Sequence, residues 1–185
     1  MKRLLQVCAV AALGGVLFSC GGSTSLDNDE ALVWLTNEIV LYTPDIDICT
    51  QNFDVSISQM DITSHIKGGV AVTTAQDVTL TRWEIEPYRT DGGTTASPKW
   101  VNDVSVYVPA GGNASLTDWR VFPVEYFYVP PLSYLLPENG SFDPETGSRN
   151  TRQSLRLVLY GRTSSGKEIA TQPISIAFNF FCVSP

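Results

Sequence analysis

Residues 155–163 of the 185-residue chain, Leu-Arg-Leu-Val-Leu-Tyr-Gly-Arg-Thr, place a leucine at every second position up to residue 159. This alternation is typical of a β-strand that buries one face and exposes the other. Residues 174–180, Ile-Ser-Ile-Ala-Phe-Asn-Phe, repeat it with isoleucine and phenylalanine. Ser-Ser-Gly at residues 164–166 supplies turn chemistry between the two runs. The pattern predicts a closing hairpin formed by residues 155–163 and 168–180.

Shorter alternating runs precede this hairpin. Their apolar residues recur at every second position: Phe53, Val55 and Ile57; Val70 and Val72; and Val104, Val106 and Val108. Residues 31–42 are compatible with a helix or a strand, and the β-forming residues among them favour a strand. The aromatic stretch 119–129 is predicted to be extended.

One predicted strand changes parity midway along its length. Leu80 belongs to one apolar face, whereas Trp83 and Ile85 belong to the opposite one. An extra residue in one strand, called a β-bulge, produces such a slip. The sequence therefore predicts a β-bulge near residues 81–82, in a strand that ends at Pro87.

No long stretch shows the helical period, and short strands alternate with loops rich in Gly, Pro, Asn and Asp. This organisation predicts an all-β domain over residues 31–185 that buries two apolar faces against each other. We expect a single antiparallel β-sandwich of about seven to nine strands. The closing hairpin resembles the last two strands of immunoglobulin-like and fibronectin type III domains, so the expected sandwich is immunoglobulin-like.

The N-terminus has the pattern of a secretory signal peptide over residues 1–19. Lys2 and Arg3 precede an apolar segment, residues 4–18, that contains no charged residue. This segment is shorter than the roughly 20 apolar residues that span a bilayer as a helix. Its length and flanking residues match the apolar region of a signal peptide.

Leu-Phe-Ser-Cys at residues 17–20 resembles the lipobox of bacterial lipoproteins. The resemblance implies that Cys20 becomes the lipidated N-terminus and anchors the protein in a membrane. It also implies the outer membrane, because Gly21 and not aspartate follows the cysteine. Residues 20–30 are small or polar and are predicted to form a flexible tether. The alternative is ordinary secretory cleavage near Ser19 without lipid.

The balance of charge is acidic, with 12 Lys plus Arg against 19 Asp plus Glu. Removal of the signal peptide takes away two more cations, Lys2 and Arg3. Nucleic-acid binding needs a basic face, so the composition argues against a nucleic-acid partner. The length after the signal suits one domain with a sizeable core.

Two cysteines, Cys49 and Cys182, remain after Cys8 leaves with the signal peptide and Cys20 takes the lipid. An oxidising compartment favours a disulfide between them, which would close nearly the whole domain into one loop. The alternative is two separate buried thiols, since free cysteine packs as a small apolar residue.

Several patterns invite a catalytic interpretation that their context does not favour. Residues 161–167 have the Gly-x-x-x-x-Gly-Lys spacing of a phosphate-binding loop, but Glu168 stands where that loop needs Ser or Thr. His65 is the single histidine, and the sequence contains no Gly-x-Ser-x-Gly motif whose serine it could activate. We expect His65 in a loop or at the surface. Glu84 and Glu86 lie two residues apart on one face, a spacing compatible with a glycosidase pair, but an ordinary solvated strand face is the favoured interpretation.

Acidic segments offer weak calcium candidates. Asp-Pro-Glu-Thr-Gly at residues 143–147 fits a turn better than a calcium loop. The acidic pairs Asp45 with Asp47 and Asp27 with Asp29 are the second candidate. We expect no metal, no cofactor and no enzymatic activity, since no recognisable nucleophile and base or ligand set is present.

The aromatic residues of the region 100–134 are the best candidates for a binding site. This predicted site consists of Trp100, Trp119, Tyr126, Tyr128 and Tyr134. Exposed rings stack on sugars or on proline-rich peptides. The alternative is that these rings fill the core and cover its open end.

Three segments resemble uncharacterised bacterial lipoproteins. They are Arg-Thr-Asp-Gly-Gly at residues 89–93, Pro-Pro-Leu-Ser to Asp-Pro-Glu-Thr-Gly within residues 130–147, and Tyr-Gly-Arg-Thr at residues 160–163. This resemblance implies no activity that could be transferred.

The sequence thus predicts a non-catalytic, lipid-anchored protein of the bacterial cell envelope. Its sandwich would serve as an adaptor or structural interaction module for another envelope protein. The alternative is a glycan- or peptide-binding module that uses residues 119–134. An enzyme comes last, because no catalytic motif is recognisable.

Overall fold

The computed structural model describes residues 31–183; the predicted signal peptide, Cys20 and the tether lie outside them. Strands and short 3-10 helices alone make up the regular structure of this range. The strands are β1 (Val33–Tyr42), β2 (Asp45–Asp47), β3 (Val55–Ile66), β4 (Val78–Arg89), β5 (Trp100–Val108), β6 (Asn113–Phe122), β7 (Asn150–Thr163), β8 (Glu168–Ala170) and β9 (Ile174–Phe181). The 3-10 helices are η1 (Thr74–Gln76), η2 (Val124–Tyr128), η3 (Leu132–Leu135) and η4 (Pro137–Asn139). No helix within residues 31–183 has the length and apolarity needed to cross a membrane.

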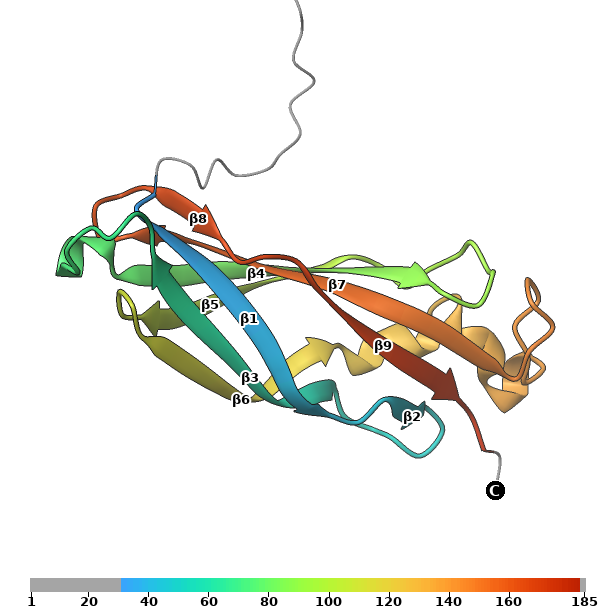
Figure 1. Cartoon of the computed structure of the whole chain (residues 1–185). Coiled ribbons are helices and arrows are strands. Elements are labelled where there is room, and N and C mark those ends of the chain that lie inside the picture. The colour runs from blue at the N-terminus through green and yellow to red at the C-terminus, as the bar shows by residue number, and fades with distance from the viewer. Residues whose placement is uncertain (1–30, 184–185) are drawn as a thin grey trace, which may run out of the picture.

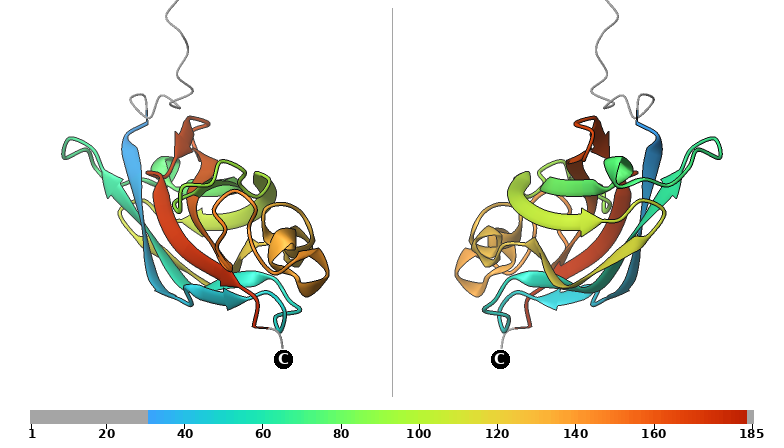
Figure 2. Two further views of the ribbon diagram at one scale, coloured as in Figure 1. Left: turned by 90° about the vertical axis from the view of Figure 1, so that its right-hand side faces the viewer. Right: turned by 90° about the vertical axis from the view of Figure 1, so that its left-hand side faces the viewer.

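Two sheets face each other across the core (Figures 1 and 2). The three-stranded sheet has the order β1-β3-β6, and the six-stranded sheet has the order β2-β9-β7-β4-β5 with β8 paired to β7. The prediction of an all-β domain is confirmed. The predicted antiparallel arrangement needs one correction, because β2 runs parallel to β9.

The core consists of the residues that each strand turns toward the opposite sheet. Val33 and Leu35 of β1 are buried, as are Leu155, Leu157 and Leu159 of β7. Residues 31–42 therefore form a strand rather than a helix, as the β-forming residues favour. The leucine alternation in the C-terminal run correctly identifies the inner face of the central strand β7.

The predicted β-bulge is present in β4. The register of β4 slips between Leu80 and Arg82 against both of its neighbours, β5 and β7. Leu80 and Trp83 are both buried, while the two residues between them, Thr81 and Arg82, are both exposed. The bulge thus turns two consecutive side chains to the outer face of the six-stranded sheet.

The strand does not end at Pro87, contrary to the prediction. Pro87 lies within β4 and pairs with Leu155 of β7. The pairing of β4 with β5 stops at Ile85 and Trp100, so beyond that point β4 has only β7 as a neighbour. A proline is tolerated there because the side of the strand that lacks an N–H faces no partner strand.

Three further expectations are wrong in detail. Phe53 precedes β3 and is exposed, and Val70 and Val72 lie exposed in the loop between β3 and β4. The aromatic stretch is not extended throughout, because β6 ends at Phe122 and η2 follows. The run 168–180 forms two strands, β8 and β9, because Thr171, still hydrogen-bonded to Leu159 of β7, also bridges Leu35 of the other sheet, and Pro173 follows.

A disulfide joins Cys49 to Cys182, with 5.1 Å between the two Cα atoms. It connects the turn after β2 with the end of β9, at the end of the molecule where the chain terminates (Figure 1). The Asp47 carboxylate accepts hydrogen bonds from the backbone N–H groups of Cys49 and Val183, at 3.1 and 3.3 Å. The alternative of two separate thiols is therefore wrong.

Gly161 is the tightest point of contact between β7 and the bulged strand. A Cβ atom at this position would lie 2.6 Å from Leu80 Cα and closer still to the Thr79 carbonyl oxygen. Both are backbone atoms, so they cannot rotate away. Only glycine allows β4 and β7 to pair at the bulge.

We expect Gly161→Ala to destabilise the domain by about 2–3 kcal/mol, because the added methyl overpacks backbone atoms. Arg162→Ala, at the exposed neighbouring position of β7, should change stability by less than about 0.5 kcal/mol. Urea unfolding followed by tryptophan fluorescence measures both. Equal values for the two variants would contradict the close approach.

Candidate functional site

His65 lies on the outer face of the three-stranded sheet. Its ring stacks on Trp34 with 4.1 Å between ring centroids, and its Nε2 lies 2.9 Å from the hydroxyl of Thr36. Among residues 31–183, no carboxylate bonds to this ring. The arrangement lacks the third group that orients a catalytic base, and it matches the predicted surface position.

Glu84 and Glu86 lie on the outer face of β4, as predicted, and both are ion-paired. Glu84 accepts from Lys99 at 2.6 Å and also contacts Arg82 at 3.2 Å. Glu86 lies 3.6 Å from Arg156 of β7. The hydrogen bond to Glu84 is the main reason that the pKa of Lys99 lies above its ordinary value. These carboxylates line an open surface rather than the two walls of a cleft.

The predicted aromatic residues are only partly gathered. Trp100 and Trp119 both pack edge-on against the buried Trp83, at centroid distances of 5.5 and 5.0 Å. Tyr126 packs edge-on against Phe122. Trp100, Trp119 and Tyr126 are half-buried, whereas Trp83 and Phe122 are buried.

The other two tyrosines lie in the 3-10 helices that follow β6. Tyr128 of η2 is 63% exposed, and Tyr134 of η3 is half-buried. Within the part of the chain that the structure describes, no ring contact joins either one to the tryptophans. The five aromatic residues therefore do not form one continuous exposed platform.

A hollow of about 180 Å³ lies at the open side of the sandwich, between the edge strands β5 and β6. Its lining includes Trp83 and Trp119 together with Asp103 and Asp118. The indole Nε1 atoms of both tryptophans are buried and have no hydrogen-bond partner. This edge hollow is the part of the aromatic region that has the shape of a site.

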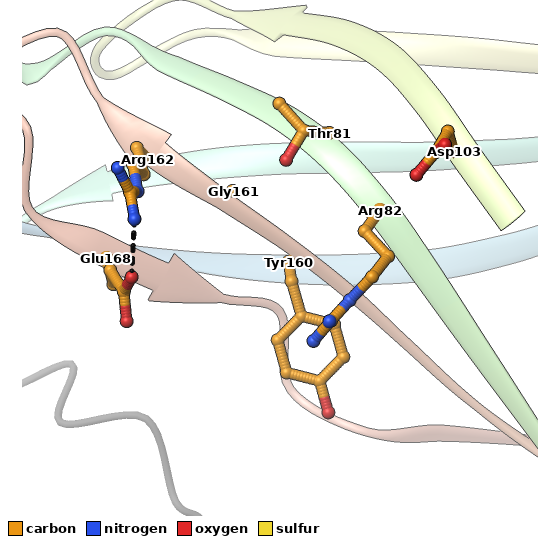
Figure 3. Close-up of a pocket in the computed structure, with 7 residues that line it drawn as sticks. All are labelled: Thr81, Arg82, Asp103, Tyr160, Gly161, Arg162 and Glu168. Atoms are coloured by element: carbon orange, nitrogen blue, oxygen red, sulfur yellow. Dashed lines mark hydrogen bonds and ion pairs between the residues drawn. The ribbon is translucent and has the colours of Figure 1, made fainter. Parts of the chain in front are cut away.

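A larger hollow, of about 330 Å³, lies on the outer face of the six-stranded sheet (Figure 3). The bulge, which turns Thr81 and Arg82 outward, supplies one side of this hollow, and β7 and β8 supply the other. Its lining consists of Thr81, Arg82, Asp103, Tyr160, Gly161, Arg162 and Glu168. Sequence reasoning did not identify this hollow as a site. The signal was the predicted bulge together with the segment 160–163.

A second hollow, of about 180 Å³, adjoins it and shares Tyr160. It is lined by Glu84, Glu86, Lys99, Arg156, Val158 and Tyr160. We refer to the two adjoining hollows together as the outer groove. Its volume falls in the range of roughly 300–1,000 Å³ that is typical of ligand sites, although its walls are low and polar.

Ion pairs connect the charged groups of the outer groove. Arg162 donates to Glu168 at 2.8 Å, and both side chains are more than half exposed. Arg82 extends across the Tyr160 ring, with its guanidinium carbon 4.8 Å from the ring centroid (Figure 3). Because exposed ion pairs contribute about 0–1 kcal/mol, these side chains are free to change partners at little cost.

Two segments that are distant in the sequence, residues 89–93 and 143–147, meet in space. Arg89 donates through Nε to Asp91 at 2.7 Å and through Nη2 to Asp143 at 2.5 Å. The Arg89 side chain is 2% exposed and that of Asp143 is 0% exposed. Glu145, in the same loop as Asp143, accepts hydrogen bonds from the backbone and hydroxyl of Thr94.

Burial raises the pKa of the Asp143 carboxyl, but the hydrogen bonds from Arg89 and Thr146 outweigh it, so this pKa lies below its ordinary value. The hydrogen bond from the Thr95 hydroxyl, together with the backbone of Thr94 and Thr95, lowers the pKa of Glu145 to about 2. Every one of these groups is therefore ionised and partnered near neutral pH. The cluster ties the loop after β4 to the loop before β7 and has no free group for chemistry.

The calcium candidates gain no support from the geometry. Asp143 and Glu145 are occupied by the hydrogen bonds just described, and Asp45 accepts from Asn179 at 2.9 Å. Within residues 31–183, the one set of three potential metal ligands is Asp47, Cys49 and Cys182. The two sulfur atoms of that set are joined in the disulfide and offer no thiolate. Asp27 and Asp29 lie outside the described residues.

No protein-family model matches the chain, and no curated protein matches its sequence. The functional assignment therefore depends on the residues and geometry of the chain itself. Of its surface features, the outer groove is the largest hollow described above and the most densely charged.

Proposed function

We propose that this chain is a non-catalytic, lipid-anchored protein of the bacterial cell envelope. Its sandwich acts as an adaptor that binds another envelope protein through the outer groove. The observation that carries the proposal is the groove itself, which is open and lined by exposed ion pairs. Protein partners bind such broad polar surfaces, whereas catalysis needs a water-excluded site with a positioned base.

The sandwich is immunoglobulin-like under this proposal, and the strand order supports that assignment. Immunoglobulin-type domains pair the first, second and fifth strands in one sheet and the third, sixth and seventh in the other. If β2 and β8 are taken as short additions and β5 as the extra strand beside the third, the order β1-β3-β6 and β9-β7-β4 follows this rule.

Anchoring by lipid at Cys20 follows from the lipobox resemblance of residues 17–20. Several acyl chains hold a protein stably on a membrane, whereas one chain alone binds weakly. In bacteria that carry such lipoproteins to the outer membrane, Gly21 after the cysteine favours that destination. The outer groove belongs to the folded domain and is independent of this anchor.

Cys20→Ala is expected to move the protein from the membrane pellet to the soluble fraction after a carbonate wash, without changing the melting temperature. The reason is that the variant loses the lipid and no part of the folded domain. Fractionation of a bacterial host that expresses each chain measures the change. A variant that stays in the pellet would refute lipid anchoring at Cys20.

The adaptor role has its own test. The full chain, extracted from its native envelope in mild detergent, should co-purify with one envelope protein in a fixed ratio. Recovery of the chain alone would contradict the adaptor function.

A second candidate is glycan binding at the edge hollow, favoured by the two indole Nε1 donors of Trp83 and Trp119 that have no protein partner. Sugar hydroxyls supply acceptors for such donors and pack on ring faces. Titration with cell-wall polysaccharide fragments should then change tryptophan fluorescence, and Trp119→Leu should abolish the change. An unchanged spectrum would exclude this candidate.

A further inference from the structure

The charges of the outer groove are balanced in number. Four cations and four carboxylates line its two hollows: Arg82, Lys99, Arg156 and Arg162, and Glu84, Glu86, Asp103 and Glu168. A ligand with charges of one sign would meet as many repelling groups as attracting ones. A polyanion such as a nucleic acid and a polycation are both disfavoured. The groove suits a ligand that carries both signs.

The outward side chains of β7 follow the two-residue period of the strand, with an arginine at each end of the row. Arg156, Val158, Tyr160 and Arg162 occupy successive outward positions of β7 and span about 20 Å, since alternate residues of a strand are about 6.6–6.8 Å apart. Carboxylates flank this row from the neighbouring strands β4 and β8. An extended peptide has the same side-chain repeat, so it matches the row when it lies along β7.

This surface is poorly suited to stacking of a sugar or an aromatic ligand. The face of Tyr160 toward Arg82 is covered by the guanidinium, at 4.8 Å from the ring centroid. In the part of the chain that the structure describes, Tyr160 is the single aromatic residue of the groove. Recognition in the groove therefore depends on charge more than on ring stacking.

Strand addition at the two edges on the open side of the sandwich, β5 and β6, is also disfavoured. In the edge strand β5, Val104 and Ser105 together lie opposite Thr81, which makes a bulge. In the edge strand β6, Asp118 has a φ of 50°, outside the extended region. Bulges and charges of this kind protect edges from added strands. The outer face is therefore better suited to a partner than the edges formed by β5 and β6.

We propose that the outer groove binds an extended segment of a partner protein in which acidic and basic side chains alternate along one face. The inference rests on the proposed adaptor function and specifies the chemistry of its partner. Each exposed ion pair of the groove exchanges its internal partner for one on the segment. Two exposed ion pairs include an arginine of the row: Arg162 with Glu168, and Arg156 with Glu86.

The test uses the full-length chain in detergent and three synthetic peptides of equal length. The first repeats Glu-Ser-Lys-Ser, which places both signs on one face of an extended chain; the others repeat Glu-Ser and Lys-Ser. Calorimetric titration should give at least about tenfold tighter binding for the mixed peptide, because the others meet like charges. Binding should weaken as salt rises from low to near-molar concentration.

Variants locate the binding surface. Arg162→Gln and Arg156→Gln should each weaken mixed-peptide binding by about two- to fivefold, the scale of one exposed ion pair. Arg149→Gln, an exposed arginine in the loop before β7, is the matched control and should leave binding unchanged. Circular dichroism confirms that all three variants keep the fold.

Some results would overturn the inference. They are no binding of the mixed peptide, equal or tighter binding of a single-sign peptide, or equal losses for Arg162→Gln and the control Arg149→Gln. A stoichiometric envelope partner recovered alongside such results would leave the adaptor function standing and refute the groove as its site. Binding of the mixed peptide without any recovered envelope partner would refute the adaptor function instead.

Discussion

Replacement of both Cys49 and Cys182 by serine is expected to lower the melting temperature of the protein by about 10–20 °C. The disulfide closes a loop with a sequence separation of 133 residues, nearly the whole folded domain. In the chain-entropy account, a loop of this length is worth about 5 kcal/mol of stability. For a domain of this size, each kcal/mol corresponds to roughly 2–4 °C.

The effect is large because domains of this kind are stable by only about 5–15 kcal/mol in total. The bridge also fixes the end of β9 to the turn after β2, beside the parallel pairing of these strands. That pairing is short, covering Asp45–Asp47, and it depends on the chain being held in place. The serine variant should therefore show early loss of amide protection in β2.

Differential scanning calorimetry with and without reductant separates the bridge from side-chain packing. The double serine variant should melt at the same temperature in both buffers. The unchanged protein should match the variant only when it is reduced. The loop-closure account would be contradicted if the wild-type protein kept its melting temperature in reductant while the serine variant lost stability. The effect would then come from packing of the cysteine side chains.

The elements of the fold that local patterns specify were predictable from the sequence. The leucine alternation of residues 155–159 identifies the buried face of β7, and the parity change between Leu80 and Trp83 identifies the bulge. Both signals depend on the two-residue period of a strand, which needs no knowledge of its neighbours. The disulfide was predictable for a different reason, because the predicted domain, residues 31–185, contains only two cysteines.

Features that depend on which strands lie side by side could not be predicted in this way. Pro87 lies inside β4 because β5 pairs with only part of that strand, which no local pattern reveals. The outer groove combines side chains from four strands, so its residues are scattered from Thr81 to Glu168 in the sequence. The contact of Arg89 with Asp143 joins the last residue of β4 to a loop residue 54 positions further along the chain, and no local pattern in the sequence indicates that pairing.

Arg89→Met is expected to destabilise the protein by about 3–5 kcal/mol. Arg89 is the cation shared by Asp91 and Asp143, and its side chain is 2% exposed. Removal of one partner from a buried ion pair leaves the others charged without compensation, which costs this much. Gly93 packs against the same guanidinium, since a Cβ atom there would lie 2.5 Å from Arg89 Nη2.

A matched control is available in Arg120, which pairs with Asp54 but is 60% exposed. Arg120→Met should cost less than about 1 kcal/mol, because exposed ion pairs contribute little. Urea unfolding of the two variants in parallel measures the difference. Similar losses for both would mean that the Arg89 cluster is not a buried, partnered network.

The dependence on pH supplies a second and independent readout. Burial raises the pKa values of Asp91 and Asp143, and the hydrogen bonds from Arg89, together with those from Thr146 and from backbone N–H groups, more than reverse this, so both lie below their ordinary values. The stability they contribute is therefore present above about pH 4, the ordinary carboxyl pKa, and is lost as the pH falls through their lowered values. Without Arg89, both carboxyls lose a hydrogen bond and a neighbouring charge that lower their pKa values, so these pKa values rise. The cost of Arg89→Met should accordingly shrink between pH 6 and pH 3, and a cost that is constant over this interval would show that lost packing, rather than lost charge compensation, is responsible.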